Sequence, residues 1–160
     1  MARTLILARH AKSDWHAGAT TDHERPLNGR GLKEAPLLAN ALNAAGYQPT
    51  LILSSDSRRT EETALLMEPT LGDPTVQFLH RLYLGSLSDI QHALETHSAN
   101  HEVVMVLGHN PGFSHAASML SSAGIELKTA CAAVLQTDQD EFSTAIQTRD
   151  FRLLGVFEGR

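Results

Sequence analysis

Near its N-terminus the chain reads Thr4-Leu5-Ile6-Leu7-Ala8-Arg9-His10-Ala11-Lys12-Ser13. The apolar run stops abruptly at a cation and an imidazole, and such a run is typical of a strand buried on both faces of a largely parallel sheet. Arg9 and His10 then lie at the carboxyl end of that strand. Because open α/β sheets bind ligands beyond the carboxyl ends of their strands, this position predicts a site. The alternative is that Arg9 and His10 only cap a strand at the protein surface.

The overall composition is that of an ordinary globular protein. The 160 residues suffice for one full core, and we expect a single domain over residues 1–160. The net charge is −5 and the 13 Lys and Arg residues are scattered, so no basic stripe predicts a nucleic-acid partner. No apolar run approaches the roughly 20 residues of a membrane span, and the first residues lack the pattern of a secretory signal. We therefore expect no membrane partner either.

The single cysteine indicates a reduced compartment. Cys131 has no second cysteine to pair with, which excludes an internal disulfide, and the simplest expectation is a cytoplasmic protein. It lies in the small apolar run Ala130-Cys131-Ala132-Ala133-Val134. An inert core thiol fits this setting better than a nucleophile does.

Predicted strands and helices alternate along most of the chain. Apolar runs indicate buried strands over residues 4–8, 51–53, 76–79 and 103–107. Apolar residues at helical spacing indicate helices over 32–46, 58–66, about 88–96 and, with Ser114 as a cap, about 114–120. Pro36 either lies in the first turn of a helix that begins after Leu32 or kinks one that begins earlier.

The C-terminal region is less regular. Residues 132–136, the turn at 138–141 and residues 142–147 are expected to form a hairpin, and the tail over 151–157 has no assigned element. With the alternating part, this pattern predicts a three-layer α/β/α sandwich whose central sheet is mostly parallel and has an antiparallel edge.

Three positions are expected to meet at one edge of the sheet. His10 ends the first strand, His109 ends the strand at 103–107, and Arg59 lies in the first turns of the helix after the second strand. With Arg9, two imidazoles and two guanidiniums would then surround one small ligand, and such forks of donors match phosphate oxygens. Metal binding is the other use of such histidines, but two arginines repel a dication and no carboxylate cluster offsets them. We expect no metal and no cofactor.

The motifs resemble a known family. The runs Arg9-His10-Ala11, Ser55-Asp56-Ser57-Arg58-Arg59-Thr60-Glu61-Glu62-Thr63 and Gly108-His109 resemble the histidine phosphatase superfamily, which is also called phosphoglycerate mutase-like. More narrowly, Arg9 to Ser13, Arg25-Pro26-Leu27 with Gly31, and Gly108-His109-Asn110-Pro111 resemble the small SixA-type phosphohistidine phosphatases. The resemblance spans roughly residues 3–120.

The resemblance implies roles for the site residues. His10 would be the phosphorylated nucleophile, and Arg9, Arg59 and His109 would form the phosphate pocket, with Arg25 as a weaker additional contact. Arg59 rather than Arg58 is the match, because the family places its arginine four residues after the serine and four before the threonine. The superfamily's usual glycine is Ala11 here, a change that SixA-type members tolerate.

The chemistry of these residues agrees with a phosphatase. A neutral imidazole, with a pKa near about 6.5, can attack phosphorus in line and form a phosphohistidine that water hydrolyses. Fixed cations can stabilise the transferring group without Mg²⁺. The expected partner is a phosphorylated protein, through its phosphohistidine, or a small phosphorylated substrate. A broad-specificity small-molecule phosphomonoesterase, a mutase and a non-catalytic phosphate-binding module stay open as alternatives. A nucleotide-binding function is disfavoured because the chain has no glycine-rich Lys-Ser/Thr loop.

Several other residues receive a plainer interpretation. Asp89 is the only acid over residues 80–89, where alkyl phosphatases of the family carry a proton donor, and its place predicts a helix cap. Trp15 either lines the pocket mouth or packs on the scaffold. Seven histidines show no partner pattern and are interpreted as solvated or structural: His16, His23, His80, His92, His97, His101 and His115.

Overall fold

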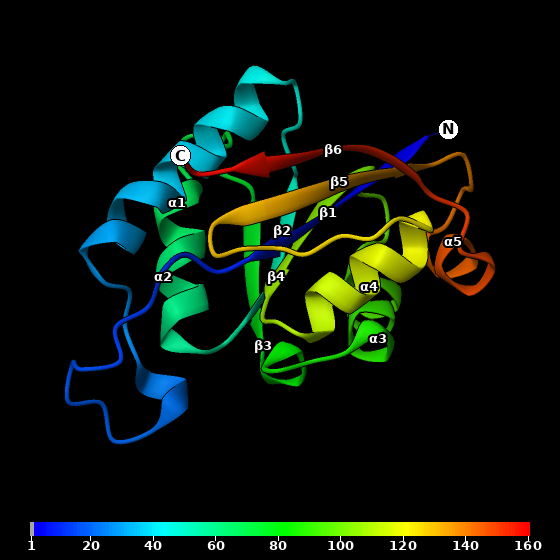
Figure 1. Cartoon of the computed structure of the whole chain (residues 1–160). Helices are drawn as coiled ribbons and strands as arrows, with labels where there is room; N and C mark the ends of the chain where they lie inside the picture. Colours follow the sequence, from blue (N-terminus) through cyan, green and yellow to red (C-terminus); the bar gives the residue numbers. More distant parts are fainter. Residues whose placement is uncertain (1) are drawn as a thin grey trace.

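Six strands and five α-helices alternate along residues 2–160, which a computed structural model describes (Figure 1). The strands are β1 (Arg3–Arg9), β2 (Leu51–Ser55), β3 (Thr75–Leu79), β4 (Val103–Gly108), β5 (Cys131–Thr137) and β6 (Arg152–Glu158). The helices are α1 (Gly29–Ala44), α2 (Arg58–Met67), α3 (Leu87–His97), α4 (Gly112–Ser121) and α5 (Phe142–Thr148). Two short 3-10 helices, η1 (Asp22–Glu24) and η2 (His80–Leu82), lie in connections.

The strands form one sheet in the order β3-β2-β4-β1-β5-β6. β1 pairs with β4, β4 with β2 and β2 with β3, all in parallel. β5 runs antiparallel to β1, and β6 runs antiparallel to β5. This arrangement confirms the predicted mostly parallel sheet with an antiparallel edge.

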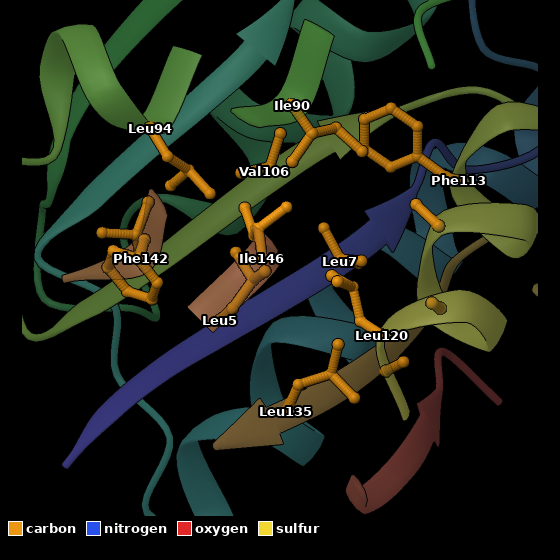
Figure 2. Packing of buried hydrophobic residues seen from close by; sticks show 14 of the residues in the cluster. Leu5, Leu7, Ile90, Leu94, Val106, Phe113, Leu120, Leu135, Phe142 and Ile146 are labelled. Atoms are coloured by element: carbon orange, nitrogen blue, oxygen red, sulfur yellow. The ribbon is translucent and has the colours of Figure 1, made fainter. Parts of the chain in front are cut away.

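Helices cover both faces of the sheet and enclose two cores. Successive residues of a strand point to opposite faces, so Leu5 and Leu7 join one core while Ile6 joins the other. The first core packs α3, α4 and α5 against the sheet, as Figure 2 shows around Phe113 and Leu120. The second core contains the buried faces of α1 and α2. The predicted α/β/α layering is therefore confirmed. No helix in residues 2–160 has both the length and the apolar character of a membrane span.

Helix α1 begins earlier than its apolar pattern indicates. The side chain of Asn28 caps it by accepting the Gly31 N–H at 2.9 Å, and Pro36 therefore lies inside the helix. The helix packs closely on the segment after β1, because a Cβ atom at Gly31 would lie 2.2 Å from the Lys12 carbonyl oxygen. A glycine at this position thus allows α1 to approach the end of β1.

Two local predictions are wrong. Residues 142–147 form helix α5 rather than the second strand of a hairpin, because Phe142, Ala145 and Ile146 recur at helical spacing and bury one face. The tail supplies β6 in its place and pairs with β5. Ser114 does not cap α4, which begins at Gly112. Its hydroxyl instead donates to Asn110 Oδ1 at 2.7 Å.

Candidate active site

The ends of β1 and β4 bring two histidines together. Arg9 and Gly108 are register partners in this parallel pair, so His10 and His109 follow at the same edge of the sheet. Their ring centroids are 5.3 Å apart. Arg59 reaches the same place from the first turn of α2, where Ser57 caps the helix. The structure therefore brings together the residues that the sequence places at two strand ends and at the start of a helix.

His10 is held as a neutral ring with a defined tautomer. His10 is only 6% exposed, and its Nδ1 donates to the Ala11 carbonyl oxygen at 2.6 Å. The lone pair of the neutral ring is then on Nε2, which faces the guanidinium of Arg59 at 3.4 Å. Burial, with added repulsion from His109 and the two arginines, lowers the pKa of His10 to about 3. The ring is therefore unprotonated at neutral pH, and its Nε2 lone pair, which accepts the Arg59 Nε–H, is the nitrogen that can act as a nucleophile.

Arg59 is fixed by contacts on both sides of its guanidinium. Nη1 donates to the Asp22 carbonyl oxygen at 2.8 Å, and Nη2 donates to the Asp22 carboxylate at 3.0 Å. Nη2 also donates to His109 Nδ1 at 3.2 Å. Arg58, one residue earlier, is exposed and pairs with Glu62 instead. Only Arg59 of this pair faces the two histidines.

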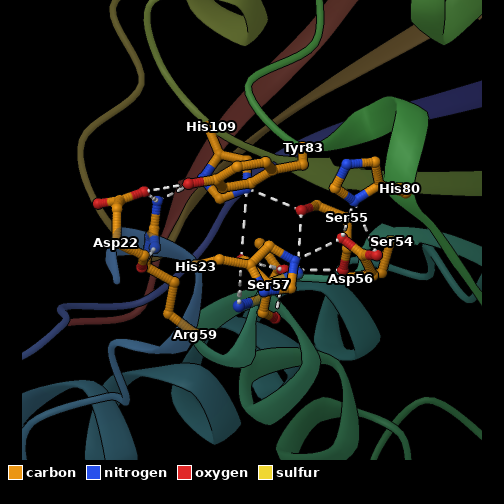
Figure 3. A network of polar contacts seen from close by, with 11 residues as sticks. Asp22, His23, Ser54, Ser55, Asp56, Ser57, Arg59, His80, Tyr83 and His109 are labelled. Atoms are coloured by element: carbon orange, nitrogen blue, oxygen red, sulfur yellow. Dashed lines mark hydrogen bonds and ion pairs between the residues drawn. The ribbon is translucent and has the colours of Figure 1, made fainter. Parts of the chain in front are cut away.

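Asp22 and Tyr83 complete this network, which Figure 3 shows, and neither was singled out from the sequence. The Tyr83 hydroxyl donates to the same Asp22 carboxylate oxygen that Arg59 contacts, and its ring stands edge-on to His109 at 5.4 Å. Burial would raise the pKa of Asp22, but the hydrogen bonds from Tyr83 and Arg59 outweigh it and hold the pKa below its ordinary value. Asp22 is therefore ionised at neutral pH and holds Arg59 in place.

Serines at the end of β2 and at the N-cap of α2 orient His109. Because its Nδ1 accepts from Arg59, the neutral ring carries its hydrogen on Nε2 and donates to Ser55 Oγ at 2.8 Å. Ser57 Oγ lies 3.4 Å from the same nitrogen. Burial, followed by repulsion from Arg59, lowers the pKa of His109 to about 3. The contacts of Ser55 and Ser57 with His109 are not predicted by the sequence and are an additional finding.

Two more arginines present donors to the pocket. The Nε atom of Arg9 and the Nε and Nη1 atoms of Arg25 are buried and have no hydrogen-bond partner among the described residues, although Arg25 Nη1 lies 3.5 Å from Asp22 Oδ1 as an ion pair. Arg9 is anchored through Nη1 to the Leu127 carbonyl oxygen at 3.2 Å, and Arg25 through Nη2 to Ser13 Oγ at 2.6 Å. Unpaired buried donors are costly unless a ligand binds them, so these atoms indicate an anion site.

The pocket itself is an open cleft of about 320 Å³. The side chain of Trp15, which is 70% exposed, forms part of its rim and stacks on the Arg25 guanidinium 3.4 Å from the ring centre. Of the two interpretations of Trp15, the structure supports the pocket mouth. The described residues that line the cleft are Arg9, His10, Lys12, Ser13, Trp15, Asp22, Arg25, Arg59, Leu84, His109, Asn110 and Thr129. Asp22 is the one carboxylate among them.

Other predicted residues lie away from the cleft. Asp89 caps α3, because its carboxylate accepts the Ser86 backbone N–H at 2.8 Å, and the predicted cap is confirmed. The bond from Ser86, then that from Arg81, lowers the pKa of Asp89. Cys131 is buried and free, as expected for a core thiol.

Three of the seven histidines interpreted as solvated or structural have side-chain partners in the fold. His23 and His80 both contact Asp56, at 2.8 Å and 3.0 Å, and His101 contacts the Thr50 hydroxyl at 2.7 Å. These partners are distant in sequence and only the fold brings them together, so no sequence spacing reveals them.

Comparison with known proteins identifies the family of this site. The histidine phosphatase superfamily (branch 1) matches residues 5–111, and the chain belongs to this superfamily. An uncharacterised chloroplast protein of Arabidopsis thaliana is 39% identical over 146 residues, which cover 85% of this chain and 67% of that protein. The predicted family is therefore confirmed.

Solved structures share the fold of the whole chain. A candidate phosphohistidine phosphatase SixA from Nakamurella multipartitia matches with a TM-score of 0.85 at 24% identity, over 98% of this chain and 95% of that one. The protein histidine phosphatase SixA in complex with tungstate matches with a TM-score of 0.81 at 19% identity, over 98% and 97% of the two chains. The phosphoglycerate mutase-like, SixA-like fold is thus shown.

Proposed function

We propose that the chain is a metal-independent phosphatase that removes phosphate from phosphohistidine on a protein through a covalent intermediate on His10. The observation that carries this proposal is the neutral ring of His10, whose Nε2 carries the lone pair and contacts Arg59 in a pocket where buried donors of Arg9 and Arg25 have no hydrogen-bond partner among the described residues. A phosphoryl group placed there would be contacted by the nucleophile and by fixed positive charge at once. A site that only bound phosphate would not need a neutral nitrogen in the attack position.

The reaction proceeds in two displacements. In the first, the Nε2 lone pair of His10 attacks phosphorus, the new N–P bond forms, and the bond from phosphorus to the leaving group breaks with its electron pair. In the second, water attacks phosphorus, the N–P bond breaks, and inorganic phosphate leaves with the lone pair restored to Nε2. Water's remaining proton goes to the phosphate or to solvent. The hydrogen stays on Nδ1 throughout and is hydrogen-bonded to the Ala11 carbonyl oxygen, which keeps the ring oriented.

The arginines stabilise the phosphoryl group during both displacements. Arg9, Arg25 and Arg59 hold donors in fixed positions, so little reorganisation is needed when negative charge spreads over the equatorial oxygens. These charges do what a divalent ion does in other phosphatases. His109 adds a further donor, because a phosphoryl dianion beside it favours its protonated form.

The substrate assignment rests on the state of the nearby acids. Asp22 is ionised and bound to Arg59, and Asp89 is occupied as the cap of α3, so neither offers a proton to a leaving group. An alkoxide needs such a proton, whereas an imidazole, with a pKa near about 6.5, leaves with little help. Phosphohistidine is therefore the favoured substrate, and the open cleft suits one carried on another protein.

The substrate is tested with a panel of phosphorylated compounds. We expect kcat/KM for a phosphohistidine peptide to exceed that for phosphoserine, 3-phosphoglycerate and a sugar phosphate by more than tenfold. Equal or better rates on the alkyl phosphates would instead support a broad-specificity phosphomonoesterase.

The nucleophile is tested separately from the substrate. His10→Ala should lose several orders of magnitude in turnover while the protein stays folded, and His92→Ala, at an exposed position of α3, should keep it. Brief exposure to labelled substrate should leave an acid-labile phosphoenzyme in the wild type only. Turnover in a folded His10→Ala protein would overturn the mechanism, and phosphate binding without any turnover in the wild type would indicate a non-catalytic module.

A further inference from the structure

A second polar cluster lies beside the pocket and takes no part in the proposed reaction. His23 of η1, Asp56 of the β2–α2 connection and His80 of η2 converge from three segments that are far apart in sequence (Figure 3). His23 Nε2 contacts one Asp56 oxygen at 2.8 Å, and His80 Nδ1 contacts the other at 3.0 Å. The three donor atoms all lie within 4.8 Å of one another.

We propose that His23, Asp56 and His80 form a binding site for a divalent transition-metal ion of the Zn²⁺ class. Two imidazole nitrogens and one carboxylate oxygen are a donor set that Zn²⁺ accepts, with water completing a tetrahedron. Bonds of about 2.0–2.2 Å place tetrahedral donors about 3.3–3.5 Å apart. The two contacts with Asp56 therefore open by a few tenths of an ångström, which small side-chain rotations provide.

The surroundings favour entry of a cation. The His80 side chain is 76% exposed, so it can rotate onto the ion and leaves an open path from solvent. The adjacent depression is negative overall, because four acidic side chains and only one arginine line it. Its lining residues are His23, Glu24, Asp56, Arg58, Glu61, Glu62 and Leu65. The phosphate pocket has the opposite character, with three arginines and one ionised acid. The two sites thus select ions of opposite charge.

An ion bound here would stabilise one wall of the pocket. His23 directly follows Asp22, which holds Arg59 through both its carbonyl and its carboxylate. Tyr83 stands edge-on to His23 at 4.8 Å and donates to Asp22. A metal ion would link η1, η2 and the start of α2 at the position where this wall is built. It lies outside the pocket, so the proposed reaction does not require it, and the proposal stands whatever the substrate is.

The experiment measures binding and melting temperature. Protein stripped with EDTA is titrated with Zn²⁺ by calorimetry, and Co²⁺ is used as a visible probe because its absorption reports tetrahedral nitrogen and oxygen ligands. We expect one saturable equivalent and a melting temperature that rises by several degrees at 100 times the dissociation constant. His80→Gln should weaken binding by more than about tenfold and remove the thermal shift.

A matched control separates this site from incidental binding. His92→Gln removes an exposed histidine from the middle of α3 and should leave the equivalent and the shift unchanged. Because His80 is exposed, its variant should fold and keep its phosphatase activity in the absence of metal, which circular dichroism and turnover check. No saturable equivalent in the wild type, or binding that His80→Gln leaves intact, would overturn the proposal.

Discussion

The two buried histidines predict a measurable loss of stability in mild acid. Burial lowers the pKa of His10 and of His109 from 6.5 to about 3 in the folded chain. Between these values the unfolded chain binds a proton at each site and the folded chain does not, so unfolding becomes easier as the pH falls. The contribution is complete above pH 6.5 and is lost progressively toward pH 3. As the pH falls from 6.5 to 4.5, each histidine lowers the free energy of unfolding by about 2 kcal/mol.

Urea unfolding of a matched pair of variants tests this value. His10→Gln has no titrating group at position 10, so over the same pH range its free energy of unfolding should fall by about 2 kcal/mol less than that of the wild type. His92→Gln, at an exposed position, should follow the wild type. The pKa of Asp22, despite its partial burial, is held below 3.8 by Tyr83 and Arg59, so its protonation lies below this range. Parallel curves for the wild type and His10→Gln would refute the reasoning.

Three further outcomes follow from the same geometry. Arg59→Lys removes the fork that contacts His10, His109 and Asp22 together, so kcat/KM should fall by about 100-fold or more in steady-state assays while circular dichroism is unchanged. Excess EDTA should leave turnover intact, as initial rates with and without the chelator would show. In separate assays without the chelator, vanadate should inhibit competitively. Asp89→Asn should keep the same turnover on every substrate but lose about 1 kcal/mol of stability in thermal melts, because it weakens a helix cap.

The parts of the site on strand ends could be predicted from the sequence. The runs around Leu5 to Leu7 and Val104 to Val106 are apolar on both faces, which only the interior strands of a covered parallel sheet require. Parallel pairing then places their carboxyl ends together, as the partnership of Arg9 with Gly108 shows. Periodicity and topology are thus enough to bring His10 near His109.

The connection between β1 and α1 could not be predicted in the same way. Residues 10–28 have no apolar period, and their course depends on contacts that only the folded chain makes, such as the bridge between Ser13 and Leu27. Asp22 and Arg25 reach the pocket along this course. Helix α5 escaped prediction for another reason, since seven residues give too few turns to distinguish a helix from a short strand.

The position of Asp22 links the choice of substrate to the way in which Arg59 is held. A carboxylate that fixes a guanidinium must be ionised, and an ionised carboxylate cannot act as a general acid. Asp22 therefore orients the guanidinium that we propose binds phosphate, and in this role it does not serve as a carboxylic proton donor. Since Asp89, the acid in the first turn of α3, is engaged in a cap, neither of these two carboxylic acids protonates a leaving group. In the reaction we propose, an imidazole leaves near neutral pH without such a proton and an alkoxide does not, so the contact that fixes Arg59 would also restrict what the pocket cleaves.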